Sequence, residues 1–439
     1  MQNKIYTAGI LTLGCKVNQY ESEAIAEALT AGGIKILSHT QICDVYVINT
    51  CTVTAESDRK ACQFIRRAIQ KNPLAYILVT GCLAEVDAMR ISQIEGVDYI
   101  CGNTNKLSIC QKALDLISRG HKNPSPEISI GDISSAPFEK MSITQFDRTR
   151  AYVKIEDGCE SKCTYCIIPY ARGKIRSKPM QDVIKEVEEL TRGGCREVVL
   201  TGIETASYGK DLGDCDLASL LCEVDKIEGI GRVRLGSLDP SLITPSFVER
   251  IKDFRSLAPH FHLSLQSGSS RVLALMKRKY NADMAMRGIE LLRQNIKNVK
   301  FTTDVIVGFP AESEEDFRQT LEFAKKAKFL MMHVFPYSKR KGTPASQMSG
   351  QIPSEIKKER ARVLSSLAKE IRADILRAAV TDTPLCEVLF ETYSDGVAKG
   401  HTADFIEVAV RSDVPLHSEI HRVRLTSADE DICYGIIDE

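Results

Sequence analysis

The sequence lacks a net charge, and it lacks any apolar run long enough to cross a membrane. Lys and Arg together number 58, as do Asp and Glu, so any electrostatic attraction to nucleic acid or membrane must be local. The longest uncharged apolar stretches, 45–55 and 74–84, are about half of the roughly 20 residues that a membrane-spanning helix needs. We therefore expect no membrane association.

The first residues also lack the features of a signal peptide. They contain one lysine and a short apolar run that alternates like a strand, with no small-residue cleavage site behind it. The 15 cysteines, an odd number, are then better explained as thiols, metal ligands or catalytic groups in a reducing compartment than as a disulfide framework. We expect a cytoplasmic protein whose chemistry depends on cysteine.

The 439 residues suggest two to four domains. Strand-like and helix-like runs alternate on both sides of a segment rich in Pro, Ser and Gly, which predicts an α/β fold with parallel sheets. Six β/α repeats over about 190 residues favour a partial barrel over a full eightfold one. We predict an N-terminal parallel-sheet α/β domain (1–120), a linker (121–148), a partial (β/α)6 barrel with a connecting helix (149–378) and a small β-barrel (379–439).

Three cysteines crowd one loop directly after a predicted strand. Cys159, Cys163 and Cys166 stand in a C-x3-C-x2-C spacing within GCESKCTYC. A structural zinc site would need four ligands, and no fourth Cys or His lies nearby in the sequence. Three thiolates on a four-iron cluster leave one iron open to bind a substrate or cosubstrate. The spacing resembles the signature of radical S-adenosylmethionine (SAM) enzymes, in which an electron from the cluster cleaves the sulfonium C–S bond of SAM.

Three further cysteines each follow a predicted parallel strand. Cys15, Cys51 and Cys82 are separated by 36 and 31 residues, each close to one βα unit of about 30 residues or more. The carboxyl ends of parallel strands share one sheet edge, which is where such folds bind ligands. A small apolar residue ending a strand would explain any one of them. All three together, with Asn18 and Asn49 beside them, indicate a polar site.

The motifs LGCKVNQYES, INTCTVT, VTGCLAE and GCESKCTYCIIPYARG resemble the methylthiotransferase family of radical SAM enzymes, and the match runs through the rest of the chain. LGCKVNQYES, DVIVGFPAES and HVFPYSKRKGTPA are similar to the branch that modifies N6-threonylcarbamoyladenosine beside the tRNA anticodon. Sister branches usually read LGCQMN or LGCPKN at the first motif. The resemblance implies two 4Fe-4S clusters, one on each cysteine triad, SAM as methyl donor and radical source, and an RNA-holding TRAM barrel at the C-terminus.

The resemblance also implies which positions contact SAM. They end predicted strands or precede the third cysteine of the loop: Tyr165, Gly202, Glu204, Ser237, Gln266 and Gly308. A turn requirement explains the glycines equally well. Glu204 departs from the family, where Asn is more usual, so its partner group is open, and Ala311 replaces the usual Gly of GFPG.

We therefore expect an enzyme, a radical SAM tRNA methylthiotransferase, acting at C2 of N6-threonylcarbamoyladenosine at position 37 of tRNA. This C–H bond is neither activated nor acidic, so a cofactor must supply the difficult step and no side chain is identified as a general base. Expected partners are tRNA and an electron donor. The alternatives are the same chemistry on isopentenyladenosine tRNA or a ribosomal-protein side chain, and a noncatalytic RNA-binding protein with structural metal sites.

Local charge predicts where tRNA is held. Residues 380–439 contain four Lys or Arg against thirteen Asp or Glu, which disfavours phosphate contacts there. Residues 148–178 contain eight Lys or Arg against three Asp or Glu, and Lys339, Arg340 and Lys341 follow the last barrel strand. We predict that phosphates are held at the mouth of the central barrel and that the acidic domain reads shape or base edges, or contacts another partner.

Overall fold

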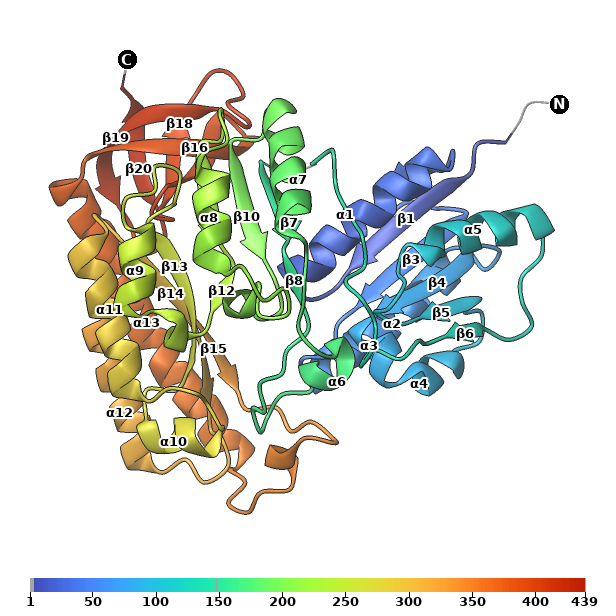
Figure 1. Cartoon of the computed structure of the whole chain (residues 1–439), viewed down its shortest axis with the longest axis horizontal. Coiled ribbons are helices and arrows are strands. Elements are labelled where there is room, and N and C mark those ends of the chain that lie inside the picture. The colour runs from blue at the N-terminus through green and yellow to red at the C-terminus, as the bar shows by residue number, and fades with distance from the viewer. Residues whose placement is uncertain (1–3, 147–148, 439) are drawn as a thin grey trace.

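The structure, a computed structural model, describes residues 4–146 and 149–438, and its first unit is a six-stranded parallel sheet in the order β2-β1-β3-β4-β5-β6 (Figure 1). Its strands are β1 (Thr7–Thr12), β2 (Lys35–Leu37), β3 (Val45–Thr50), β4 (Tyr76–Gly81), β5 (Tyr99–Cys101) and β6 (Glu127–Ser129). The predicted parallel α/β arrangement is confirmed. The sheet continues into the segment expected to be a linker, because β6 pairs with β5 there.

Alternation along the buried strands explains why helices cover both faces of this sheet. On β3, Val45 and Val47 face a core completed by α1 (Lys16–Ala31) and α5 (Ser108–Arg119). The next residues along, Tyr46 and Ile48, face the opposite core. That core is completed by α2 (Ala55–Lys71), α3 (Cys82–Val86) and α4 (Ala88–Ser92). Both faces are thus apolar, as a parallel sheet between two helix layers requires.

The central unit, called here the half-barrel, consists of two parallel sheets with the orders β11-β10-β7 and β12-β13-β14-β15. Its strands are β7 (Arg150–Lys154), β10 (Glu197–Thr201), β11 (Arg232–Leu235), β12 (Ser237–Leu238), β13 (His260–Gln266), β14 (Lys300–Val307) and β15 (Met331–Pro336). Its helices are α6 (Ile168–Arg172), α7 (Met180–Arg192), α8 (Leu217–Asp225), α9 (Pro245–Ile251), α10 (Ser270–Leu275), α11 (Ala282–Asn295) and α12 (Glu314–Ala327). A short antiparallel ribbon joins β8 (Glu156–Asp157) to β9 (Arg176–Ser177). The expected partial barrel is confirmed.

The two faces of the half-barrel strands differ in chemistry. Apolar residues such as Phe261, Leu263 and Leu265 of β13 belong to the large core under the helices. The alternating positions of the same strands form the interior face, which carries polar residues such as His260 and His262. Because side chains alternate along a strand, every second residue lies on the interior face, and the polar residues occupy these positions.

A long helix and a closed barrel complete the chain. Helix α13 (Ser354–Asp382) packs along β15 and α12 and leads into a barrel closed in the order β16-β17-β18-β20-β19. Its strands are β16 (Leu385–Ser394), β17 (Val397–Thr402), β18 (Glu407–Arg411), β19 (Ile420–Ala428) and β20 (Cys433–Ile437). The predicted C-terminal β-barrel is confirmed.

This C-terminal barrel packs on the amino ends of the half-barrel strands. Arg232, the first residue of β11, donates to the carbonyl oxygens of Glu387 and His401 at 2.9 and 3.1 Å. Arg150, the first residue of β7, pairs with Glu391 at 3.1 Å. Figure 1 accordingly shows the barrel at the end of the half-barrel opposite α6. Part of its acidic charge is therefore neutralised inside the molecule.

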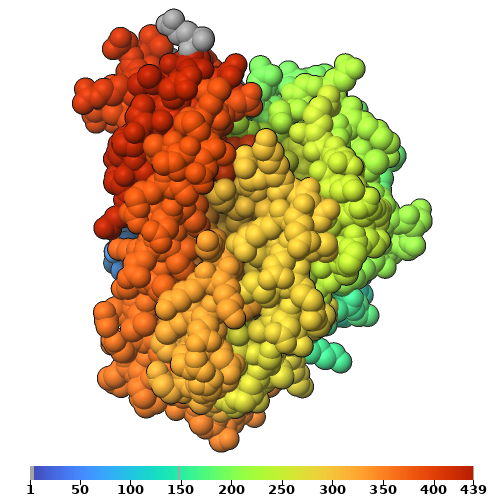
Figure 2. Space-filling model, turned by 90° about the vertical axis from the view of Figure 1, so that its left-hand side faces the viewer, coloured from blue at the N-terminus to red at the C-terminus, as the bar shows by residue number. Residues whose placement is uncertain are grey.

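The outer face of the half-barrel is covered by helices. Figure 2 looks onto α11, α12 and α13, with the C-terminal barrel at one end of this face. Within the described ranges, no helix combines the length and the apolar character that a bilayer crossing requires.

Candidate functional site

The structure brings Cys15, Cys51 and Cys82 together at the carboxyl edge of the N-terminal sheet. Cys15 precedes α1, Cys51 follows β3, and Cys82 begins α3 directly after β4. Gly14 makes this approach possible: a Cβ there would lie 2.9 Å from the Cβ and 3.1 Å from the Sγ of Cys51. Its φ of 108° is also one that side chains disfavour. Gly14 therefore leaves room for the three cysteines to converge, as their positions after the strand ends predicted.

The second triad lies on the loop between β8 and α6. Backbone N–H groups of Ser161 and Ile168 donate to the sulfurs of Cys159 and Cys166, each at 3.4 Å. The guanidinium of Arg278 donates from Nη1 to Cys163 Sγ at 3.1 Å. Each sulfur on this loop thus has a hydrogen-bond donor aimed at it, which stabilises a thiolate, whereas the Glu204 carboxylate beside Cys159 acts in the opposite direction at that sulfur.

The three thiols of each triad are the ligand type of an iron–sulfur cluster. A four-iron cluster takes each thiolate at a different iron. Burial raises the pKa of Cys51 and of Cys166 to about 11 each, so these groups stay protonated at neutral pH without a metal. Binding a cluster would therefore release protons from them.

Arg172, fully buried in α6 just after the second triad, connects the two triads. Its Nε donates to Cys82 Sγ at 3.2 Å, and its Nη2 donates to Asn18 Oδ1 at 2.6 Å. Its Nη1 meets the carboxylates of Glu21 at 2.5 Å and Asp157 at 3.3 Å. Arg172, on the helix after one triad, thus contacts a cysteine of the other triad and links the two through a buried side chain.

A buried ionic cluster surrounds Arg172 at this interface. Lys106 and Lys154 both contact Glu21, and Lys154 also pairs with Asp157 at 2.7 Å. Burial alone would raise the pKa of Glu21, but the positive charges of Arg172, Lys106 and Lys154 hold it well below its ordinary value. With Arg176 on Asp157, four cations face two carboxylates. The excess positive charge beside Cys82 fits the negative charge of cysteine thiolates on a cluster.

The six positions expected to contact SAM lie at the carboxyl ends of half-barrel strands or on the cysteine loop. Tyr165 packs edge-on against Phe309 with ring centroids 6.5 Å apart. Ser237 is exposed in β12, and Gln266 ends β13 with a φ of 67°. Gly308 directly follows β14, and its N–H donates to Glu312 Oε2 at 2.6 Å. The fold therefore gathers these positions at one edge, where contact with SAM stays a prediction.

Gly202 and Glu204 are tied to a buried carboxyl group. A Cβ at Gly202 would lie 2.6 Å from Glu156 Oε2, and the Glu204 N–H donates to that oxygen at 2.8 Å. Burial raises the pKa of Glu156 well above its ordinary value, which favours the neutral form of this carboxyl group. Close packing against Glu156 therefore explains why residue 202 is a glycine. The open question of the partner of Glu204 is answered too: its carboxylate accepts from Cys159 Sγ at 3.2 Å and from Ser161 Oγ at 3.1 Å.

Two site residues were not singled out from the sequence. Arg278 bridges Cys163 to Asp239, which its Nη2 contacts at 2.8 Å. Arg172 was visible only as part of the GCESKCTYCIIPYARG motif, and its reach to Cys82 depends on the packing of α6 against α3. Position within a motif could have marked Arg172, whereas no local signal marks Arg278.

The expected basic surface at the barrel mouth is smaller than the sequence indicated. Arg340 is buried and pairs with Asp58 at 2.6 Å, and its Nη2 donates to Thr52 Oγ1 at 2.7 Å, so it joins the two units beside Cys51. Four cations of residues 148–178 are likewise buried: Lys154, Arg172, Arg176 and Lys178. Arg148 lies outside the described residues. The exposed cations that remain on these segments include Lys162, Lys174, Lys277, Lys279, Lys339 and Lys341.

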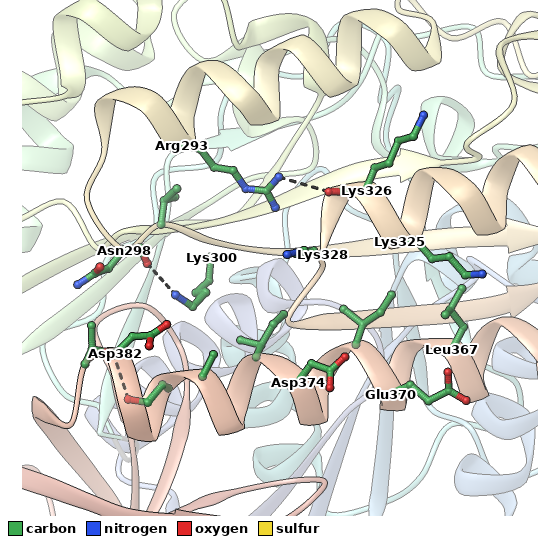
Figure 3. Close-up of a pocket in the computed structure, with 16 residues that line it drawn as sticks. Arg293, Asn298, Lys300, Lys325, Lys326, Lys328, Leu367, Glu370, Asp374 and Asp382 are labelled. Atoms are coloured by element: carbon green, nitrogen blue, oxygen red, sulfur yellow. Dashed lines mark hydrogen bonds between the residues drawn. The ribbon is translucent and has the colours of Figure 1, made fainter.

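A separate cleft lies on the outer face of the half-barrel, away from both triads (Figure 3). It has a volume of about 710 Å³, and its walls carry Lys325, Lys326 and Lys328 opposite Glu370 and Asp374 of α13. None of the six triad cysteines lines it. It is therefore not the place of the cysteine chemistry.

Comparisons with known proteins bear on both units. Residues 153–324 match the Radical SAM superfamily, and residues 7–102 match a family described as Uncharacterized protein family UPF0004. The chain is 39% identical to the threonylcarbamoyladenosine tRNA methylthiotransferase MtaB of Bacillus subtilis (strain 168), covering 96% of this chain and 94% of the relative. It is 34% identical to a tRNA-2-methylthio-N(6)-dimethylallyladenosine synthase of Acetivibrio thermocellus, covering 95% of this chain and 88% of that protein.

Among solved structures, the fold is similar to that of the radical S-adenosylmethionine methyltransferase TsrM from Kitasatospora setae. The TM-score is 0.57 at 15% sequence identity, covering 78% of this chain and 77% of that chain. That structure contains cobalamin and a [4Fe-4S] cluster. At this identity the likeness concerns the fold.

Proposed function

Since the chain belongs to the radical SAM tRNA methylthiotransferases, we propose that it replaces the C2 hydrogen of N6-threonylcarbamoyladenosine at position 37 of tRNA with a methylthio group. The observation that carries the proposal is the pairing of two cysteine triads across one buried interface, with Arg172 in contact with Cys82. A noncatalytic RNA-binding protein with structural metal sites would have no need for two cysteine triads that each leave one iron of a cluster open.

In this proposal the two triads hold two 4Fe-4S clusters, Cys159, Cys163 and Cys166 one of them and Cys15, Cys51 and Cys82 the other. When bound, the first supplies the electron that cleaves SAM, and the second presents or supplies the sulfur. The protein's part is to hold and orient the cofactors and the substrate. The N–H groups of Ser161 and Ile168 stabilise negative charge on the first triad.

Other residues of the carboxyl edge would position SAM and exclude water. The Glu204 carboxylate beside Cys159 is placed to accept hydrogen bonds from the amino group of SAM. The Tyr165 ring, largely enclosed against Phe309, offers an apolar surface for adenine. Ser237, Gln266 and the backbone at Gly202 and Gly308 would supply the remaining polar contacts. No residue is assigned as a general base.

The substrate assignment is tested in cells. A strain lacking this protein should accumulate N6-threonylcarbamoyladenosine without its 2-methylthio derivative, while isopentenyl-type nucleosides stay unchanged. Mass spectrometry of digested tRNA measures both. The opposite pattern would assign the protein to the isopentenyladenosine branch.

We further expect the exposed cations at the carboxyl edge to contact tRNA phosphates. Replacing Lys339 and Lys341 with Gln should weaken tRNA binding and flatten the slope of log affinity against log salt by about one to two units, because two phosphate contacts are lost. Arg340 is left in place, since its removal would leave Asp58 with a weaker partner at the interface. Fluorescence anisotropy over a salt series measures the slope.

A matched control removes the same charge from the far face. Lys325 and Lys326 are exposed on α12, beside the outer cleft (Figure 3), and changing both to Gln should leave the slope nearly unchanged. Equal effects of the two double variants would show that the phosphate contacts are not located near the triads. Truncation after Thr381 is a poorer test, because it would uncover interior arginines that stack on Phe405.

A further inference from the structure

One phenylalanine ring stays open to solvent on the interior face of the half-barrel. Phe335, near the end of β15, is 46% exposed, and it is the only exposed one of the 14 phenylalanines, all of which lie in the described ranges. Met332 and Val334 pack in the core under the helices. The alternation of β15 therefore turns His333 and Phe335 toward the interior, where both are exposed.

The register of the sheet places this ring at the carboxyl edge. Ile306 of β14 is the register partner of Phe335, and β14 ends one residue later, just before Gly308. Gln266, the last residue of β13, is paired with Val305. Phe335 therefore lies within about one residue of the level of Gln266, one of the positions expected to contact SAM.

The expected SAM positions leave the strand of Phe335 to another ligand. They lie on the cysteine loop and at the ends of β10, β12, β13 and β14. Strand β15 is outermost in its sheet, next to β14, and carries none of them. It ends at the same end of the half-barrel as α6 (Figure 1). A ligand that covers Phe335 would thus lie beside SAM.

The segment that follows Phe335 contacts the loops of both triads. The backbone N–H of Ala55, which begins α2 just after the β3 cysteine of the first triad, donates to Ser338 Oγ at 3.4 Å. The backbone N–H of Ala345 donates to the carbonyl oxygen of Thr164, within the loop of the second triad, at 2.8 Å. The end of β15 is therefore joined to the loop of each triad.

The ring is held in place and stands near exposed cations. The ring of His333 lies 6.4 Å from that of Phe335 and 6.3 Å from that of His262, so neighbouring rings limit the directions in which Phe335 can turn. Lys339 and Lys341, which are expected to hold phosphates, follow Phe335 by four and six residues. Aromatic rings beside cations are the usual combination in sites for single-stranded nucleic acid.

We propose that Phe335 is the stacking surface for the adenine ring at position 37, which leaves the anticodon loop and lies flat on this side chain beside SAM. This inference rests on the proposed function. Enzymes that modify a base take it out of its stack. An aromatic side chain then replaces the lost stacking, because every base has a π-face. Phe335 is thereby a positioning residue that holds adenine C2 near the loops of both triads.

The test compares anticodon stem-loop RNAs that carry N6-threonylcarbamoyladenosine or an abasic residue at position 37. The iron-loaded protein and its Phe335→Ala variant are titrated with both. We expect Phe335→Ala to weaken binding of the modified RNA about 5- to 100-fold, as for one lost stacked base, and to change binding of the abasic RNA less than about twofold. Phe335→Trp should keep the preference for the modified RNA because a π-face remains, whereas Phe335→Leu should lose most of it.

Controls separate a lost contact with the base from other damage. Cleavage of SAM without RNA, and iron content, should be the same in the Phe335 variants as in the native protein, because the ring holds neither SAM nor a cluster. Tyr434→Ala removes a ring that is 42% exposed on β20 of the C-terminal barrel. This matched variant should leave the preference for the modified RNA over the abasic RNA unchanged.

Three results would overturn the inference. If Phe335→Ala kept the full preference for the modified RNA, the base would not stack on this ring. If the variant weakened both RNAs equally, the role of Phe335 would be merely structural. Loss of SAM cleavage with an intact preference for the modified RNA would show that the ring covers SAM instead.

The proposed function is judged separately, on the native protein. If the native protein methylthiolates an isopentenyladenosine stem-loop and leaves the threonylcarbamoyl one unchanged, the proposed function itself fails. If it methylthiolates the threonylcarbamoyl stem-loop while Phe335→Ala keeps the native preference, only the role of Phe335 fails.

Discussion

Replacing Cys15, Cys51 and Cys82 together with Ala should halve the iron of the anaerobically reconstituted chain and abolish methylthiolation. Two clusters correspond to about eight iron and eight sulfide per chain, and the triple variant should hold about four of each. Cleavage of SAM should remain measurable, because Cys159, Cys163 and Cys166 lie on a separate loop. Iron and sulfide analysis, 5′-deoxyadenosine formation and mass spectrometry of tRNA follow the three quantities.

A matched variant carries three substitutions at cysteines outside the triads. Cys62, Cys195 and Cys222 lie in helix or strand-flanking positions away from the carboxyl edge, and changing them to Ala should leave the iron content near eight. If the Cys15, Cys51 and Cys82 variant kept all its iron, these three cysteines would not bind a cluster, and the prediction from the strand ends would be wrong. Loss of all iron would show that the two triads do not load independently.

Changing Glu21 to Gln should destabilise the protein by about 3–5 kcal/mol, as expected when one partner of a buried ionic group is removed. Lys106 is fully buried, and Glu21 is its ion-pair partner. Without that carboxylate, Lys106, Lys154 and Arg172 would face only Asp157. Urea unfolding under anaerobic conditions measures the loss.

A double-mutant cycle distinguishes this charge effect from general damage to α1. Glu21→Gln combined with Lys106→Met should recover part of the lost stability, because the uncompensated cation is removed as well. Glu27→Gln, on the exposed side of the same helix, should cost less than about 1 kcal/mol; its carboxylate accepts backbone N–H groups of Thr144 and Gln145 near the surface. Equal losses for Glu21→Gln and Glu27→Gln would contradict the central role of the buried cluster.

Much of the fold could be predicted from the sequence because its signals are local. Apolar runs that alternate with amphipathic runs mark the parallel strands and their helices. The Pro- and Gly-rich stretch marks the change of unit, although β6 lies within this stretch and pairs with β5. The cysteine positions followed from one further rule, that parallel strands end at a common edge. Cys15, Cys51 and Cys82 could therefore be grouped before their contacts were known.

Charge was the property that the sequence predicted least well. Counting Lys and Arg in residues 148–178 indicated a basic surface, yet Lys154 and Arg172 are buried in ion pairs with Glu21 of a distant segment, and Lys178 is buried in an ion pair with Glu186. Arg340 likewise pairs with Asp58 of the other unit. Whether a cation meets phosphate or a buried carboxylate depends on a partner far away in the chain, and no local pattern encodes that partner.

The sequence by itself thus determined the elements, the six cysteines and the chemistry they indicate, because spacing within a loop and position at a strand end are local properties. Only the tertiary structure decided which groups face one another, such as Arg172 with Cys82 and Arg278 with Cys163. The physical reason is that these contacts join segments far apart in the sequence through long, charged side chains, whose direction is set by packing and by the partners they neutralise.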